Sequence, residues 1–292
     1  MANSKAKGGG AGSRTLSNPV QPFALGQKVK YLPLYYIAAF IIPFLLTLVA
    51  YINFDVYPFG ERSVLTLDLN GQYIYYFEAI RDAFWGDGSA FYNWSRNLSG
   101  GFMGIIGYYL ASPFTFIVIL LPRKMILESM MIMQMCKVGA AGFTFFIYAQ
   151  RSKNLRPLQS VIFSTMYSMM AYIVIQLIDP MWIDGPIFLP LIILGVEYLI
   201  DDGRKLNYII PTAIMFIAIF YIGFMIAIFI AIYYFYYLFF GKKAQYKGAG
   251  DYVKTTFVMG ISTFVVLLCS IIMILPVYNA LALGKFDFSD PD

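Results

Sequence analysis

The sequence predicts an all-α protein, a polytopic bundle of transmembrane helices, on three observations. Hydrophobic residues make up 60% of the 292 residues and charged residues only 13%, whereas soluble domains average roughly half and a quarter. Several apolar runs are long enough to cross the roughly 30 Å hydrocarbon core of a bilayer as helices. Basic residues gather at the ends of alternate runs, as the positive-inside rule requires of cytoplasmic loops. This rule accounts for the net charge of +5, so no nucleic-acid partner is expected.

The amino-terminal part of the chain sets the predicted orientation. Residues 1–30 are rich in Gly, Ser and Lys and offer little to bury, so we expect a disordered basic tail and a cytoplasmic N-terminus. The first span, 31–52, has no A-x-A cleavage site and is interpreted as a retained signal anchor. Residues 53–102 are the predicted first extracellular loop, because acidic residues outnumber basic ones there: Asp55, Glu61, Asp68, Glu78, Asp82 and Asp87.

Six further apolar runs follow, and together they extend the predicted transmembrane domain over 31–292. They cover residues 103–121, 125–149, 158–178, 181–200, 208–240 and 255–275. The run 208–240 would extend about 50 Å as one helix, so we predict two short spans divided near residues 221–224. The run 103–121 contains Pro113 and would have both ends outside. It is therefore a re-entrant segment or two half-helices, or else the predicted alternation of inside and outside loops fails there. No closing element follows the last run, and we expect the chain to be the amino-terminal part of a longer protein.

The residue types available limit the chemistry. The sequence contains no histidine, which excludes His-based catalysis and leaves acid–base chemistry to carboxylates, Lys, Tyr or water. Cys136 and Cys269 lie in apolar runs without a CxxC partner and are interpreted as small buried hydrophobic residues. No metal site and no cofactor is predicted from the residue pattern, while a divalent cation held by an outer carboxylate stays an open alternative.

Two outer carboxylates are candidates for catalysis. Asp68 and Gln72 lie four residues apart in a stretch, 65–85, whose apolar residues recur at helical spacing, so both side chains should share one face of an amphipathic surface helix. Asp184 follows Trp182 at the outer end of a span. The functional hypothesis is that Asp68 and Asp184 converge, one deprotonating an acceptor hydroxyl and the other orienting it. The alternatives are a helix-start carboxylate for Asp68 and a turn residue beside an interfacial Trp for Asp184.

Two basic residues are candidates for binding phosphate. Lys137 lies midway along the run 125–149, where an unpaired ammonium costs at least about 3 kcal/mol. Glu128 cannot pair with it inside the helix, because nine residues separate the two by roughly 13 Å and place them on opposite faces. The partner is therefore either a carboxylate on a neighbouring helix or an anionic ligand such as a lipid phosphate. Arg96, before a Gly-rich stretch, is the second candidate, with a solvated loop charge as its alternative.

An ordered series of short patterns resembles the bacterial YfhO family. The patterns are DLNGQYIYYF, WSRNLSGGFMG with YYLASPF, the lysine within a span, and MYSMMAYIV followed by MWIDGPIFLPLIILGVEYLI. The resemblance runs from about residue 31 to the end. It implies a GT-C-like glycosyltransferase fold, a polyprenyl-phosphate sugar donor such as one on undecaprenyl phosphate, and an acidic catalytic base in the first outer loop.

The resemblance implies a catalytic role for Asp68 and matches other residues to positions of the family, while the roles of Lys137 and Asp184 are inferred from this sequence. Asp68 matches the first-loop acid, Gln72 and Tyr73 are its companions, Lys137 matches the buried lysine, and Trp182 with Asp184 matches the outer MWID segment. It implies a plasma-membrane protein of a bacterium that moves a sugar to an extracellular glycopolymer such as lipoteichoic acid. Two other classes stay open on the residues alone: a lipid or solute transporter or flippase, suggested by the divided run and the buried lysine, and a non-catalytic envelope assembly protein.

Overall fold

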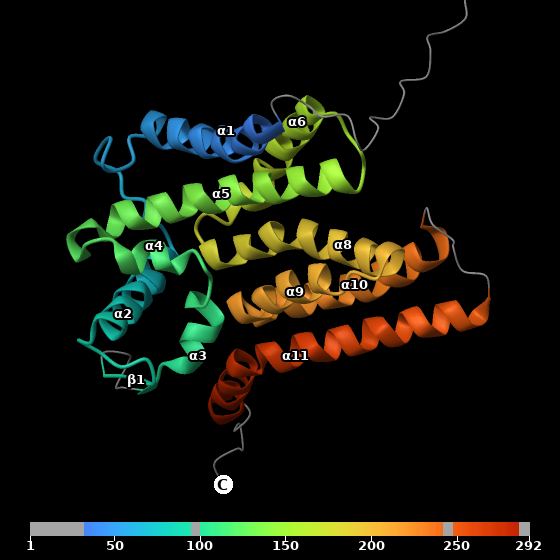
Figure 1. Cartoon of the computed structure of the whole chain (residues 1–292). Helices are drawn as coiled ribbons and strands as arrows, with labels where there is room; N and C mark the ends of the chain where they lie inside the picture. Colours follow the sequence, from blue (N-terminus) through green and yellow to red (C-terminus); the bar gives the residue numbers. More distant parts are fainter. Residues whose placement is uncertain (1–31, 95–99, 242–247, 286–292) are drawn as a thin grey trace, which may run out of the picture.

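The computed structural model describes residues 32–94, 100–241 and 248–285, and these residues are almost entirely helical (Figure 1). The α-helices are joined by short 3₁₀ or π segments (η) and one two-residue strand pair. In chain order the elements are α1 (Leu32–Asn53), η1 (Leu69–Tyr73), α2 (Ile74–Trp85), β1 (Tyr92–Asn93), β2 (Gly100–Gly101), α3 (Met103–Ile105), η2 (Ile106–Leu110), α4 (Thr115–Leu120), η3 (Arg123–Met125), α5 (Ile126–Arg151), α6 (Pro157–Ser168), α7 (Ala171–Ile175), η4 (Pro180–Ile183), α8 (Asp184–Asp202), α9 (Leu206–Ala218), α10 (Phe220–Phe240) and α11 (Ala249–Lys285).

Five helical stretches in the described part of the chain are long and apolar enough to cross a membrane. They are Leu32–Asn53, Arg123–Arg151, Pro180–Asp202, Phe220–Phe240 and Ala249–Asn279. This confirms the predicted all-α, polytopic membrane fold. The α5 and α8 spans are mostly buried, whereas the α1 and α11 spans are mostly exposed, so α5 and α8 form the interior of the bundle and the other two lie at its edge.

The long helices lie side by side, and the elements between α1 and α5 gather at one end of the bundle (Figure 1). We call this end, which carries residues 54–122, the loop end. The α1 and α5 helices approach closely because Gly142 faces α1: a Cβ there would lie 2.5 Å from the Ala39 carbonyl oxygen. Close helix approach through small residues is the usual packing mode of membrane helices.

The irregular run predicted at 103–121 forms two helical pieces. One consists of α3 and η2, the other is α4, and the chain breaks between Ala111 and Phe114, around Pro113. Proline lacks an amide hydrogen and disfavours helix in the residue before it, which accounts for the break. The run is therefore two short helical pieces rather than one continuous helix, as the alternative of two half-helices expects.

Two predicted spans differ from the structure. The run 158–178 is not one span but α6 and α7, separated at Met169–Met170. In α6 the hydroxyls of Ser164 and Ser168 each donate to a backbone carbonyl three residues earlier, and such bonds compete with regular helix. The run 208–240 divides at Ile219, whose backbone is extended (φ −158°, ψ 103°), two residues before the predicted position. Of its two halves, α10 alone reaches the length of a span.

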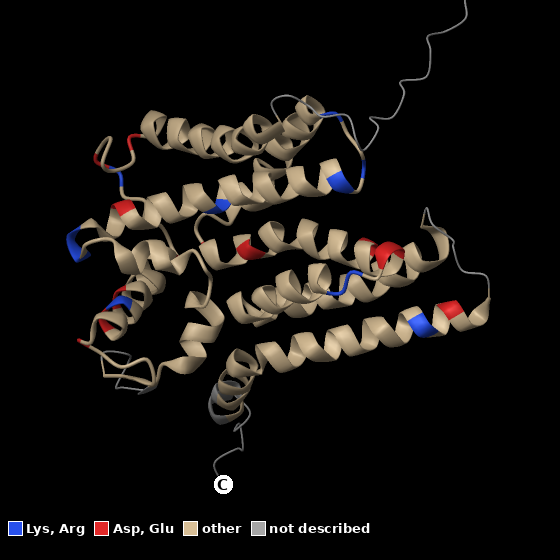
Figure 2. Cartoon of the chain, viewed as in Figure 1, with Lys and Arg blue, Asp and Glu red and all other residues tan. Residues whose placement is uncertain are grey.

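Charged side chains differ between the two ends of the bundle (Figure 2). Among the described residues of the loop end, acidic residues outnumber the basic Arg62 and Arg81, and Arg123 and Lys124 follow directly after it. The opposite end carries the basic residues Arg151, Lys153, Arg156, Arg204, Lys205 and Lys254, and fewer acidic ones, Glu197, Asp201, Asp202 and Asp251. Basic residues favour the cytoplasmic side, so this asymmetry supports the prediction that the loop end faces outward.

Candidate functional site

Asp68 lies at the loop end, directly before η1. Its side chain is exposed, and it makes no capping hydrogen bond to the helical segment that it precedes. The preceding Leu67 has φ +49°, a left-handed conformation that is rare for a bulky residue and marks a fixed local turn. The Asp68 carboxylate therefore follows a sharply turned backbone and stays open to a ligand.

Gln72 and Tyr73 follow Asp68 along η1 and point to different surroundings. Gln72 is exposed, like Asp68, whereas Tyr73 is buried. Burial raises the pKa of the Tyr73 hydroxyl, and the adjacent carboxylate of Asp179 and the charge of Asp68 raise it further. The Tyr73 hydroxyl therefore stays neutral, and its electrostatic interaction with Asp179 places the first loop close to the segment before α8.

Six aromatic side chains at the loop end form what we call the aromatic cluster: Tyr73, Tyr76, Tyr108, Tyr109, Trp182 and Tyr221. Ring centroids lie 5.2 Å apart for Tyr73–Tyr109, 4.6 Å for Tyr108–Tyr109, 6.4 Å for Tyr108–Tyr221 and 6.2 Å for Trp182–Tyr221. The rings come from η1, α2, η2, η4 and α10. The cluster thus joins the first loop, the half-helix break and the start of two spans in one surface.

Two polar atoms at this cluster are buried without a hydrogen-bond partner among the described residues. They are Asp179 Oδ1 and Trp182 Nε1, three residues apart around η4. A buried polar atom without a partner is uncommon, and a bound ligand or water is the usual reason for one. Sequence reasoning placed Asp179 on the outer side but did not select it. Asp179 lies five residues before Asp184 in the same outer segment, and this proximity could have marked it as a candidate site residue.

Lys137 and Asp184 form an ion pair in the interior of the bundle. Lys137 Nζ lies 2.9 Å from Asp184 Oδ2 and donates to the Pro180 carbonyl oxygen at 2.8 Å. Ser112 Oγ, from the break between the half-helices, donates to Asp184 Oδ1 at 3.0 Å. Lys137 also lies 5.6 Å from the centre of the Phe114 ring. The ion pair therefore ties α5, the start of α8 and the half-helix break together.

This pairing changes the interpretation of both residues. The side chains of Lys137 and Asp184 are 1% and 0% exposed, so neither reaches a ligand in this conformation. The geometry matches the carboxylate alternative for Lys137 rather than the phosphate one. It also separates Asp184 from the exposed Asp68, so the expected convergence of these two carboxylates at the outer surface is not present.

A model of the family described as bacterial membrane protein YfhO matches residues 38–289 of the chain. The protein belongs to the YfhO family. The match contains the aromatic cluster, the Lys137–Asp184 ion pair and Asp68. No curated protein and no solved structure matches the sequence, so the GT-C-like comparison stays a prediction.

Two further expectations for this YfhO-family chain concern ligand binding. Arg96, the second phosphate candidate, lies outside the described residues. Within the described ranges, no group of three or more His, Cys, Asp or Glu side chains is arranged to hold a metal ion. The described candidate site therefore consists of Asp68, Gln72, Tyr73, Asp179 and the aromatic rings around Trp182.

Proposed function

We propose that this YfhO-family protein is a membrane glycosyltransferase that moves a sugar from a polyprenyl-phosphate donor to an extracellular glycopolymer. The acceptor hydroxyl oxygen attacks the anomeric carbon of the donor. The bond from this carbon to the phosphate oxygen breaks, and polyprenyl phosphate leaves with the bonding electron pair. The hydroxyl proton passes to the carboxylate of Asp68.

One observation carries the proposal: the exposed carboxylate of Asp68, free of a capping bond, beside the aromatic cluster at the loop end. A general base must be within hydrogen-bond reach of the proton that it accepts, and an exposed, unused carboxylate meets this condition. Gln72, exposed four residues later, is assigned to orienting the acceptor. Tyr73 is assigned to holding Asp179 through its hydroxyl, which stays protonated because its pKa is raised.

Asp179 and Trp182 are assigned to binding the sugar of the donor. Their unpartnered Oδ1 and Nε1 atoms match the donors and acceptors that sugar hydroxyls offer. Arg96 remains our candidate for the departing phosphate, since a guanidinium binds phosphate through two parallel hydrogen bonds. Lys137 and Asp184 are reassigned to positioning: their ion pair and the Pro180 contact hold η4, and with it Asp179 and Trp182, in place.

The test is complementation in a strain that lacks the gene, using the full-length protein and its Asp68→Asn variant. The sugar content of purified wall and lipid-anchored polymers is measured, with Glu61→Gln as a matched control, because Glu61 is another exposed acidic residue of the same loop. We expect wild type and Glu61→Gln to restore the sugar and Asp68→Asn to lower it by a factor of about 10²–10⁴, the range for a general base. Full restoration by Asp68→Asn would refute the assignment.

The transporter alternative makes a different prediction in purified form. Reconstituted into vesicles with a labelled polyprenyl-phosphate sugar, a flippase moves the label between leaflets without an acceptor, and Asp68→Asn leaves this movement intact. A transferase instead releases polyprenyl phosphate only when an acceptor is present. Movement without any transfer would favour the alternative.

A further inference from the structure

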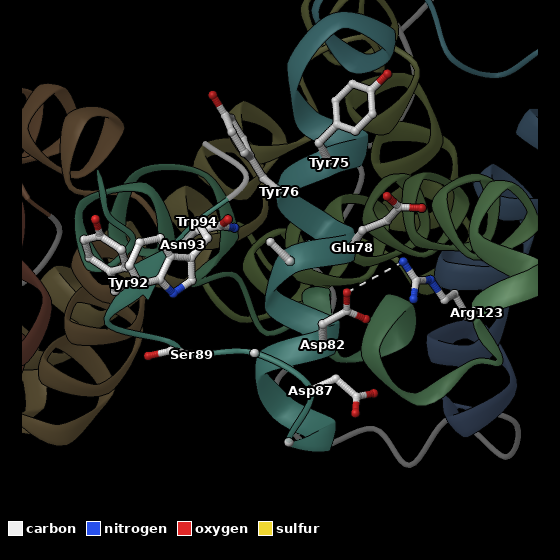
Figure 3. Close-up of a pocket in the computed structure, with 13 residues that line it drawn as sticks. Tyr75, Tyr76, Glu78, Asp82, Asp87, Ser89, Tyr92, Asn93, Trp94 and Arg123 are labelled. Atoms are coloured by element: carbon white, nitrogen blue, oxygen red, sulfur yellow. Dashed lines mark ion pairs between the residues drawn. The ribbon is translucent and has the colours of Figure 1, made fainter. Parts of the chain in front are cut away.

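A concave site lies at the loop end, outside the group around Asp68. It is a cavity of about 670 Å³, which is within the range of roughly 300–1,000 Å³ for small-ligand sites. Its wall comes from α2, from the turn after it and from β1, with Arg123 at one side (Figure 3). Gly86 makes this shape possible, since its φ of +92° ends α2 and turns the chain back towards β1.

Four aromatic residues line this cavity. Trp94 is 80% exposed and Tyr75 61% exposed, and the rings of Tyr92 and Trp94 meet edge to face at 4.9 Å. The pairing of Tyr92 with Gly101 in the short strand pair fixes this part of the wall. The fourth aromatic residue of the lining is Tyr76. Such side chains offer large, rigid contact surfaces with a polar end, at low entropic cost on binding.

Carboxylates supply most of the charge in the same cavity. Among the described lining residues, Glu78, Asp82 and Asp87 are acidic and only Arg123 is basic, which gives a net charge of −2. Figure 3 shows Glu78 and Asp82 on α2 and Asp87 in the turn after it, with Tyr92 and Trp94 on the other side of the view. The dashed line marks the ion pair of 3.7 Å between Arg123 and Asp82. Ionised carboxylates only accept hydrogen bonds, and several lone pairs on each stay available for hydroxyl or ammonium donors.

We propose that this cavity is a glycan-binding site that takes neutral or amino-bearing saccharides and rejects polyanionic ones. The ring faces cover the apolar C–H faces of a sugar, and the carboxylates accept bonds from its hydroxyls. Among the described lining residues, a phosphate-rich chain would meet three carboxylates and one guanidinium, which already pairs with Asp82. The acidic lining therefore selects for the uncharged or amino-bearing part of a polymer.

The cavity is connected to the group around Asp68 through Tyr76. This ring lines the cavity and also contacts the aromatic cluster, at 5.2 Å from Tyr109 and 6.5 Å from Tyr73. A saccharide in the cavity would therefore extend towards η1. The role of the cavity as the acceptor site rests on the proposed transfer reaction, but glycan binding itself does not.

The test is binding of the full chain, in lipid nanodiscs, to an array of neutral, amino-bearing and phosphate- or uronate-bearing oligosaccharides. We expect neutral or amino-bearing glycans to be retained, and Trp94→Ala to weaken their binding roughly tenfold, equivalent to about 1.4 kcal/mol. Phe91→Ala is the matched control, because Phe91 is also exposed (75%) but does not line the cavity. The combined Glu78→Gln and Asp87→Asn variant should gain binding to anionic glycans.

Three results would overturn the proposal. They are the absence of any retained glycan, a preference of wild type for anionic glycans, or equal losses in Trp94→Ala and Phe91→Ala, which would assign these rings to the membrane interface. Failure here is distinguishable from failure of the proposed function. Wild type that restores polymer sugar but retains no glycan refutes the cavity alone, whereas glycan binding with full activity of Asp68→Asn refutes the proposed reaction alone.

Discussion

Replacement of Lys137 by Met should destabilise the bundle strongly, since it removes the only cation within reach of the buried Asp184 carboxylate among the described residues. The carboxylate is 0% exposed and would keep only the hydrogen bond from Ser112, at 3.0 Å. Removing one partner of a buried ion pair costs about 3–5 kcal/mol, because the other charge is left without compensation. For proteins of this size roughly 2–4 °C of Tm corresponds to each kcal/mol, so the expected loss of Tm is about 6–20 °C.

The assay is thermal unfolding of the purified full chain in detergent, with a second variant that removes both charges. Lys137→Met with Asp184→Leu leaves no buried charge, and replacing a whole buried pair by apolar residues is often neutral or stabilising. The double variant should therefore regain most of the lost Tm. Lys124→Met is the control, because Lys124 is exposed and lies just before the same helix. A single variant within about 2 °C of wild type, or a double variant no better than the single one, would refute the reasoning.

Two further predictions concern packing and the Tyr73 contact. Gly142→Ala places a methyl group 2.5 Å from the Ala39 carbonyl oxygen and 2.9 Å from Pro43. It should therefore push α1 away from α5, cost about 1–3 kcal/mol of stability and lower the Tm. An unchanged Tm would show that the two helices separate freely. Tyr73→Phe removes the hydroxyl that we propose holds Asp179 and should lower transfer. Because the raised pKa keeps Tyr73 protonated below its ordinary value near 10, its stabilising contact is complete there and is lost only as the pH rises through the folded-state pKa. Wild type and Tyr73→Phe should therefore have pH–activity profiles of the same shape between about pH 6 and 9, and a limb that disappears in the variant would contradict this.

The spans could be predicted from the sequence because membrane helices depend on local composition. A run of about 20 apolar residues satisfies both the bilayer thickness and the backbone hydrogen bonds within itself, and this predicted α1, α5 and α8 closely. The prediction was wrong for residues 158–178 because apolar composition does not report a break. That break lies beside hydroxyl side chains that bond to the backbone, and their effect on helix continuity depends on geometry.

The candidate site was predictable only in part. Asp68 stood out because it is a carboxylate at the start of a helical pattern in an acidic loop, and these features are local. The partner of Lys137 was not predictable, since 47 residues separate it from Asp184. From the sequence alone, many carboxylates could supply the negative charge that Lys137 needs. Only the packing of α5 against the start of α8 selects one of them.

The short segment around η4 explains why two aspartates five residues apart differ in their surroundings. Asp179 precedes the 3₁₀ turn and lies beside Tyr73 of the first loop, whereas Asp184 begins α8 and lies in the interior against Lys137. The Pro180 carbonyl, between them, accepts from the same ammonium. Because one lysine holds both ends of the turn, a shift of the ion pair would move Asp179 and Trp182 relative to Asp68. We therefore expect the buried charges to act on the proposed site through position. A loss of the proposed transfer in a Lys137 variant should be accompanied by a loss of Tm, unlike the loss in Asp68→Asn.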